Sequence, residues 1–298
     1  MRLSVLDTSP IVAGSSARQA LHNTVDLAIL ADELGCHRYW VPEHHSMRGV
    51  ASSAPAVLAA RLADATSRIR VGAGGVLLPN HPPLVVAEQF GTLAALHPGR
   101  IDLGIGRALG GPPRVADAIH RNGDFPAQLA ELTGYFTGGQ PLTAVPAIGN
   151  PVEFWLLGSS TSSARLAASL DLSYAFAHHR NPHETSTATG TYREACPEPQ
   201  LIVSVSAIVA ETDARAEWLA GPIRSKVARR KLGKRILLPS PDDADSAEPI
   251  PGMLVGAPDT VRKQLQAIAD ETGADELMIT TPIYDHADRR RSYELLTA

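Results

Sequence analysis

Three side chains that can exchange protons or bind ions stand together at Glu43, His44 and His45, directly after the short run Tyr-Trp-Val-Pro. Histidine titrates closest to neutral pH, so one imidazole at the opening of an active site could act as an acid/base. A metal site is disfavoured, because adjacent histidines on an extended chain point to opposite faces and neither a helical His pair nor a His-x-His pair occurs here. Two polar residues that brace a loop are the remaining alternative.

A second candidate site is the serine-rich stretch 158–168. Ser159, Ser160 and Ser163 lie where a helix is expected to begin, and the free N–H groups and the positive end of the helix dipole attract an anion such as phosphate. Serine is also a common N-cap, so a helix cap without a ligand is the alternative. Arg107 favours the phosphate, because it follows the neighbouring predicted strand and its guanidinium could reach the same anion.

Glycines in Val-Gly-Ala-Gly-Gly-Val, residues 71–76, indicate a strand where a flat ligand approaches the backbone or where the peptide adopts an unusual conformation. Packing room inside a narrow barrel is the alternative. This stretch and Gly-Ile-Gly-Arg-Ala-Leu at 104–109 both lack the third glycine of the dinucleotide fingerprint, and no Walker loop occurs. The sequence therefore predicts neither a Rossmann nor a Walker nucleotide site.

The elements that must position these residues alternate regularly along the chain. Short β-branched or apolar runs are followed by longer stretches of helical periodicity, as in β-α units around a parallel sheet. We predict strands at 2–6, 37–41, 69–78, 100–106, 153–158, 173–177, 201–210 and 276–282. We predict helices at 17–35, 54–66, 83–97, 125–136, 161–170, 184–195, 258–272 and 286–297. Eight strands in this alternation favour an α/β fold of the (β/α)8 TIM-barrel type, in which active sites collect at the C-terminal ends of the strands.

A single domain over residues 1–298 is expected, since one barrel of this length is ordinary. Two irregular insertions are predicted, at about 107–153 and about 235–252. The acidic, proline-rich part of the second insertion, 238–252, is predicted to be a mobile loop. It is a candidate lid over the mouth of the barrel, and disorder without such a role is the alternative.

The composition is typical of a soluble protein whose partner is a small molecule. A net charge of −4 with 19% charged residues gives no broad attraction to nucleic acid or to anionic membranes. The chain shows neither a signal-peptide core nor an apolar run of about 18 residues, which predicts a cytoplasmic protein. Cys36 and Cys196 fit no zinc-ribbon or thioredoxin spacing and are interpreted as reduced core thiols.

Four stretches together resemble the flavin-dependent luciferase-like monooxygenase family. They are YWVPEHH (39–45), the block from Ile69 to Ala108, FWLLGSSTSSARLAA (154–168) and ADELMITTPIYDHADRRRSYELL (274–296). The resemblance spans nearly the whole chain in the same order. It implies a (β/α)8 barrel that binds FMN, supplied as reduced flavin (FMNH2) by a separate flavin reductase, and that uses O2. It also implies a homodimer.

The resemblance implies a role for each matched residue. His44 is the implied acid/base beside the flavin, with Glu43 and His45 in supporting positions. The implied contacts of the flavin ring are Ala73, Gly74, Gly75 and His178, with Gly74 and Gly75 often joined by a non-prolyl cis peptide. The implied phosphate-binding positions are Arg107, Ser159, Ser160 and Ser163.

The loop after 100–106 departs from the family pattern. Close relatives usually read GRAPGTD where this chain has GRALGGPPR, with Leu109, Gly111 and Pro112 in place of proline, threonine and aspartate. Because such loops shape the substrate pocket, an aliphatic aldehyde, an aromatic polyketide and another secondary metabolite all stay open. An excess of arginine over lysine indicates a GC-rich bacterial genome. This bias and the altered loop favour a substrate from secondary metabolism. Two alternative functions stay open: a deazaflavin (F420)-dependent oxidoreductase and a non-catalytic flavin-binding barrel.

Overall fold

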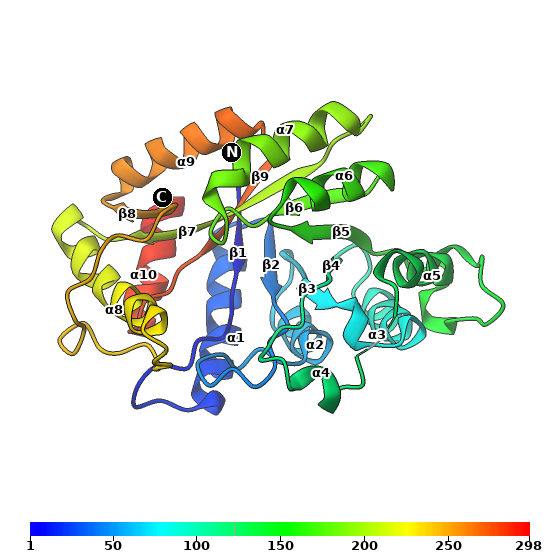
Figure 1. The fold of residues 1–298 in the computed structure, drawn as a ribbon, viewed down its shortest axis with the longest axis horizontal. Coiled ribbons are helices and arrows are strands. Elements are labelled where there is room, and N and C mark those ends of the chain that lie inside the picture. Colours follow the sequence, from blue (N-terminus) through cyan, green and yellow to red (C-terminus); the bar gives the residue numbers. More distant parts are fainter. Residues whose placement is uncertain (122) are drawn as a thin grey trace.

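A closed parallel barrel forms the centre of the molecule (Figure 1). The computed structural model describes residues 1–121 and 123–298. The strands follow one another in the order β6-β5-β4-β3-β2-β1-β9-β7, and β7 pairs back with β6 to close the ring, which confirms the predicted (β/α)8 barrel. The barrel strands are β1 (Arg2–Leu6), β2 (Arg38–Val41), β3 (Arg70–Leu77), β4 (Ile101–Gly106), β5 (Glu153–Gly158), β6 (Ser173–Phe176), β7 (Leu201–Val209) and β9 (Glu276–Thr280).

Helices cover the outside of the barrel (Figure 1). The predicted ones are found with ends that differ by at most two residues: α1 (Ala17–Glu33), α2 (Pro55–Ala65), α3 (Pro83–Leu96), α5 (Phe125–Thr137), α6 (Thr161–Ser169), α7 (Thr185–Ala195), α9 (Pro258–Thr272) and α10 (His286–Thr297). Prolines open α2, α3 and α9, where the missing N–H has no helical partner anyway. Gly138 and Gly273 end α5 and α9 in the left-handed conformation that glycine adopts easily.

Several elements are absent from the sequence prediction. They are α4 (Val115–Ala118), α8 (Asp213–Lys231), β8 (Met253–Gly256) and the short 3-10 turns η1 (Leu78–Asn80), η2 (Val145–Ala147) and η3 (Pro182–Glu184). Strand β7 pairs with β9 up to Ser206 and then with β8 up to Val209, so β8 extends the sheet beyond the ring. The predicted number of eight strands is therefore right for the barrel and one too few for the sheet.

Apolar side chains fill the middle of the barrel interior. They are Leu6, Trp40, Trp155, Ala175, Ile202 and Met278. A methyl group on Gly74 would lie 3.0 Å from both Leu6 and Trp40, so this glycine makes room for the apolar layer. The packing-room interpretation of the glycines in β3 is thus part of their role.

An ionic network fills the end of the interior where the strands begin. Arg38 pairs with Asp102 at 2.9 Å, with Glu153 at 2.7 Å and with Glu276 at 3.1 Å. Arg70 adds a second guanidinium, 2.6 Å from Asp102. Arg38, Asp102 and Glu276 are buried. Paired charges and apolar side chains thus occupy the interior from the start of the strands to its middle, and the polar residues after the strands lie at the opposite end.

The 238–252 segment has no helix or strand, as the sequence predicts, but it is tied to the barrel at three points. The N–H of Ala13 donates to the carbonyl of Leu238 at 2.8 Å. The guanidinium of Arg229 on α8 donates to Asp245 at 2.6 and 2.9 Å. Gly252 packs against the ring of His178.

Candidate functional site

Glu43 is the buried centre of a hydrogen-bond cluster after β2. Its carboxylate accepts from His45 Nε2 at 2.7 Å, His81 Nε2 at 2.9 Å, Asn80 Nδ2 at 3.0 Å and the N–H of Leu77 at 2.9 Å. Burial raises the pKa of this carboxyl, but the hydrogen bonds outweigh burial and hold the pKa below its usual 4.5. Glu43 is therefore ionised at neutral pH and joins the turn after β2 to the turn after β3.

His44 has different surroundings from its two neighbours. Its Nδ1 is buried and has no hydrogen-bond partner in the described part of the chain. Its backbone N–H donates to the carbonyl of Ser52 at 2.9 Å, which fixes the turn. Burial first, and the charge of Arg180 second, lower the pKa of His44 below 6.5, so its imidazole is neutral at pH 7. A buried nitrogen without a partner fits a site that a polar ligand completes.

Strand β3 presents bare backbone near this turn. The peptide bond between Gly74 and Gly75 is cis, in the place that the resemblance implies. A Cβ atom on Gly75 would overlap the carbonyl of Gly104 on β4, so only glycine fits there. Ala73 is buried in the core between the barrel and its helices and can reach a ligand only through its backbone. This part of β3 therefore offers a flat surface on which a planar ring could lie.

The serine turn between β5 and α6 is a capping box. Ser160 Oγ accepts from the N–H of Ser163, and Ser163 Oγ accepts from the N–H of Ser160. Ser163 Oγ also lies 2.8 Å from the hydroxyl of Tyr174, and the side chain is buried. The carbonyl of Ser159 accepts from the side chain of Asn181 at 2.9 Å. The hydroxyls of Ser160 and Ser163 thus hold the start of the helix, as the cap interpretation expects, and orient the first-turn N–H groups that helices leave free.

Arg107 follows β4, which pairs in register with β5, so Arg107 and the serine turn start from neighbouring strands. The Arg107 carbonyl accepts from Arg121 Nη2 at 2.6 Å. Both arginines line a hollow of about 220 Å³ together with Pro79, Gly123 and Phe125. No hydrogen bond links Arg107 to the serine turn within residues 1–121 and 123–298. Two guanidinium groups at one hollow make an anion favourable there.

The two histidines after β6 lie on different sides of the chain. His178 Nδ1 is 2.8 Å from the hydroxyl of Thr185 at the start of α7, and Gly252 covers its ring. His178, the residue implied to lie against the flavin edge, therefore packs between α7 and the 238–252 segment.

His179 instead lies toward the barrel interior. Its Nδ1 is 2.9 Å from Ser204 Oγ on β7. Ile202 on the same strand belongs to the interior apolar layer, and side chains alternate along a strand, so Ser204 also faces inward. Burial lowers the pKa of His179 to about 4, so this imidazole is neutral throughout the physiological range.

Sequence reasoning missed several polar residues at this end of the barrel. They are Asn80, His81, Arg121, His179 and Arg180. Four of them lie in the segments that follow β3 and β6, so they share with Glu43 a position just after a strand. The local sequence does not indicate which way their side chains point.

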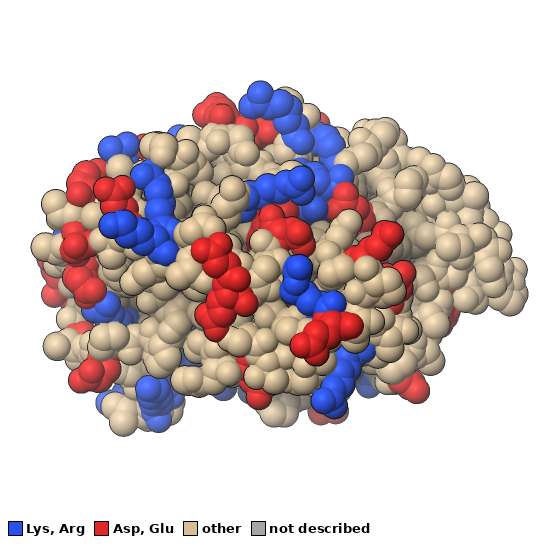
Figure 2. All heavy atoms as spheres, turned by 90° about the horizontal axis from the view of Figure 1, so that it is seen from above, with Lys and Arg blue, Asp and Glu red and all other residues tan. Residues whose placement is uncertain are grey.

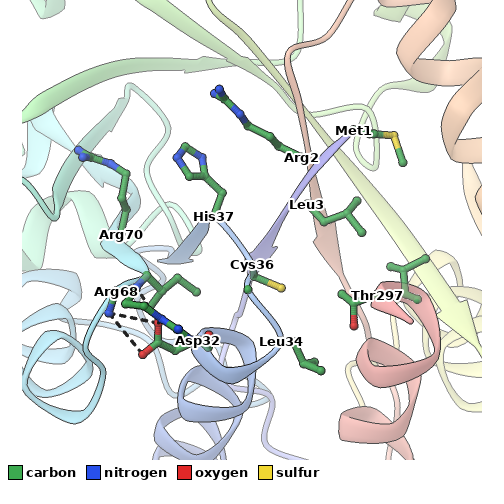
Figure 3. A pocket seen from close by; sticks show the side chains of 13 residues that line it. Met1, Arg2, Leu3, Asp32, Leu34, Cys36, His37, Arg68, Arg70 and Thr297 are labelled. Atoms are coloured by element: carbon green, nitrogen blue, oxygen red, sulfur yellow. Dashed lines mark hydrogen bonds and ion pairs between the residues drawn. The ribbon is translucent and has the colours of Figure 1, made fainter.

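A wider hollow, about 660 Å³, lies at the other end of the barrel (Figure 3). Its lining includes Arg2, His37 and Arg70, which extend to the same side, and the ion pair between Arg68 and Asp32. It lies where the strands begin, an end of the barrel that supports stability more often than chemistry.

The described part of the chain contains no helix with both the length and the apolar character needed to cross a bilayer.

Comparisons with known proteins agree on one family. The family model described as luciferase-like monooxygenase matches residues 1–276. A luciferase-like monooxygenase of Escherichia coli (strain K12) is 42% identical, over 98% of this chain and 95% of its own. The crystal structure of apo-MsnO8 is 43% identical with a TM-score of 0.95, covering 99% of this chain and 96% of that chain.

A more distant structure shares the fold. The oxygenating constituent of 3,6-diketocamphane monooxygenase from Pseudomonas putida, in complex with FMN, has a TM-score of 0.78 at 21% identity, over 100% of this chain and 96% of its own. With a matching family model, full-length relatives above 40% identity and a closed barrel that carries polar residues after its strands, the chain belongs to the luciferase-like monooxygenase family.

Proposed function

We propose that the protein is an FMN-dependent monooxygenase that takes reduced flavin from a separate flavin reductase and uses O2 to oxygenate a small organic substrate. The observation that carries the proposal is the buried Nδ1 of His44, which has no partner among the described residues and lies at the same barrel end as the bare Gly74–Gly75 backbone. These two features fit a planar, polar ring, and the relative from Pseudomonas putida binds FMN.

The residues divide the work between holding the cofactor and moving protons. Arg107 and the free N–H groups in the first turn of α6, which follows Ser160, would bind the phosphate of the flavin. The flavin ring would lie on the backbone of Gly74 and Gly75. Reduced flavin supplies the electrons with which O2 is activated. His44, neutral at pH 7, accepts or returns a proton at Nδ1, while Glu43 holds the turn on which His44 is placed.

Further proposals concern the partners and the setting of the protein. We propose a cytoplasmic location, supported by the composition. We also propose a homodimer. Its support is an uncharged stretch from 132 to 152 with the exposed apolar side chains Leu142 and Val145; the end of the molecule formed by α5 and the segment after it carries few charges in Figure 2. We propose that the substrate is a secondary metabolite such as a polyketide, because the loop that begins at Arg107 departs from the family pattern.

Binding of flavin with and without its phosphate tests the cofactor assignment. The wild-type protein should bind FMN at least about tenfold more tightly than riboflavin, since a charge-assisted contact to phosphate contributes about 1.5–3 kcal/mol. Arg107→Gln should remove most of that difference, whereas Arg61→Gln, on the exposed face of α2, should leave it unchanged. Equal affinity of Arg107→Gln and wild type for FMN would contradict the phosphate site.

The nature of the reaction is tested by the same titration with F420 and by oxygen uptake. Tight binding of F420 without oxygen consumption would replace the monooxygenase by a deazaflavin-dependent oxidoreductase. Binding of FMN without any oxygen consumption in the presence of a reductase would instead leave a flavin-binding barrel.

A further inference from the structure

Arg180 is a rigidly mounted arginine at the rim of the barrel. Its backbone N–H donates to the carbonyl of Ala177 at 3.1 Å, and the next residue, Asn181, is held to Ser159 at 2.9 Å. Its side chain is exposed, and within residues 1–121 and 123–298 its guanidinium has neither a hydrogen bond nor an ion pair. The fixed turn thus presents a cation that has no ion-pair partner among the described residues.

The strand order places Arg180 opposite His44. In the ring of eight strands, β2 and β6 are four positions apart in either direction, so their C-terminal turns face each other across the mouth. His44 lies on the first turn and Arg180 on the second. The charge of Arg180 reaches the imidazole, because it contributes to the lowered pKa of His44. A molecule bound across the mouth, from the turn after β2 to the turn after β6, could contact both residues.

Glu43, at the same end of the barrel, is already engaged by other groups. Glu43 accepts from His45, His81, Asn80 and Leu77.

Two further carboxylates there are also occupied. Asp7 pairs with Arg289 at 2.5 Å, and Glu184 accepts from Thr161 at 2.8 Å. None of these three carboxylates pairs with Arg180, so a ligand could supply its counter-charge.

We propose that Arg180 determines substrate specificity by binding an anionic group, a carboxylate, on the substrate, so that the rest of the molecule extends toward His44. The planar guanidinium matches a carboxylate with two parallel hydrogen bonds. The half-buried Leu157 packs on the interior apolar layer. Its apolar side chain favours a substrate whose remaining part, apart from the carboxylate, is apolar. The inference rests on the proposed function, because it assigns a substrate class to the same mouth.

Paired probes that differ only in charge test the assignment. Hexanoate and hexanamide, and phenylacetate and phenylacetamide, are titrated calorimetrically into flavin-free protein and into protein loaded with FMN. The wild type should bind at least one acid about tenfold or more tightly than its amide. Arg180→Gln should remove this preference, Arg180→Lys should keep part of it, and Arg165→Gln, an exposed arginine on α6, should behave as wild type. Absence of any preference in the wild type, or its persistence in Arg180→Gln, overturns the proposal.

Histidine NMR gives a readout that does not depend on turnover. In flavin-free protein labelled at histidine, Arg180→Gln should raise the pKa of His44, and saturating hexanoate should raise it in the wild type alone. The other groups that face this ring, Glu43, His45 and the carbonyl of Gly110, are unchanged in the comparison. An unmoved His44 resonance on addition of hexanoate would contradict a carboxylate bound between the two turns.

The flavin titrations separate this inference from the proposed function. If Arg180→Gln weakens FMN more than tenfold and leaves the acid-over-amide preference intact, Arg180 serves the cofactor and the proposal fails. If the wild type binds no FMN but flavin-free protein still prefers the acid through Arg180, the proposed function fails and the anion site stands.

Discussion

Adjacent histidines at the mouth of the barrel have opposite roles in the structure. His45 donates to Glu43 at 2.7 Å, whereas Nδ1 of His44 has no partner among the described residues. Of these two imidazoles, His44 is therefore the one whose Nδ1 could exchange a proton with a bound molecule, and its lowered pKa keeps it neutral at pH 7.

Replacement of His44 by alanine should suppress substrate oxygenation and spare the cofactor. The rate should fall about 100-fold or more, the usual size of an acid–base contribution, while the dissociation constant of FMN should change less than about threefold. Single-turnover kinetics and flavin titration measure the two effects. His22→Gln, at an exposed position of α1, is the control, and an unchanged rate in His44→Ala would remove His44 from the mechanism.

Replacement of Glu43 by glutamine should lower the free energy of unfolding by about 2 kcal/mol at pH 7, since a buried ionised acceptor with four donors is lost. The pKa of Glu43 is lower in the folded state than the unfolded value of 4.5, so its contribution is complete above pH 4.5 and disappears as the pH falls through the folded pKa. Urea denaturation at several pH values should show the two proteins converging below pH 4.5. A difference that grows on acidification would contradict this assignment.

At this scale the sequence identified Glu43, His44 and His45, because their types and their position after a strand are local properties. The different contacts of these three residues depend on His81 and Asn80, which bind Glu43 from the turn after β3 and are brought there by the barrel. No local signal reveals that pairing.

Strands β3 and β4 lie unusually close at their glycines. A methyl group on Gly72 would overlap the backbone carbonyl of Asp102, and neither strand can move without opening the barrel. The close approach supports the flat backbone surface at Gly74 and Gly75.

Two glycine-to-alanine substitutions should therefore have opposite effects. Gly72→Ala should destabilise the protein by about 3 kcal/mol or more, at the upper end of overpacking costs. Gly190→Ala, in the interior of α7 with nothing within 4 Å of the added methyl group, should stabilise it by about 0.5–1 kcal/mol. Thermal unfolding of both variants checks this contrast, and similar melting temperatures would refute the close packing of β3 on β4.

The 238–252 segment should open locally when its central tie is removed. Asp245→Asn weakens the contacts to Arg229 and Ser225 on α8, so hydrogen exchange should accelerate in this segment and stay unchanged in the barrel strands. Ser240→Ala, which removes a bond within the segment to Asp243, serves as a comparison. Uniform acceleration over the whole chain would indicate global destabilisation instead.

Helices and strands with a strong periodic pattern could be predicted to within two residues at their ends. Helix α8 is different, because its many charged residues and Pro222 leave a weak apolar face. Strand β8 has four residues, too few to show alternation. The sequence likewise does not predict which way the side chains of His178 and His179 point, since this depends on the residue at which β6 ends.

The whole barrel depends on charges contributed from distant parts of the chain. Arg38 and Glu276 are 238 residues apart in sequence and 3.1 Å apart in the interior. Burial raises the pKa of Asp102, although the neighbouring Arg38 and Arg70 act to lower it.

Removal of Arg38 should be costly, because it leaves buried carboxylates uncompensated. Arg38→Met should lower the free energy of unfolding by about 3–5 kcal/mol, whereas Arg61→Met, which breaks an exposed pair with Asp64, should change it by less than about 1 kcal/mol. Chemical denaturation measures both values. A small effect of Arg38→Met would show that water reaches the network.

The strand pattern and the family likeness were sufficient to predict the barrel, whereas the network at its floor was not predicted. Its members look like ordinary charged residues at the starts of strands, and only closure of the ring turns them inward.

The interior of the barrel is filled on the side where the strands begin. Trp40, Trp155 and the ionic network beneath them block passage through that end. Two molecules that bind at the mouth would therefore use the same entrance. Under the proposed function, that entrance would serve both the flavin and the substrate.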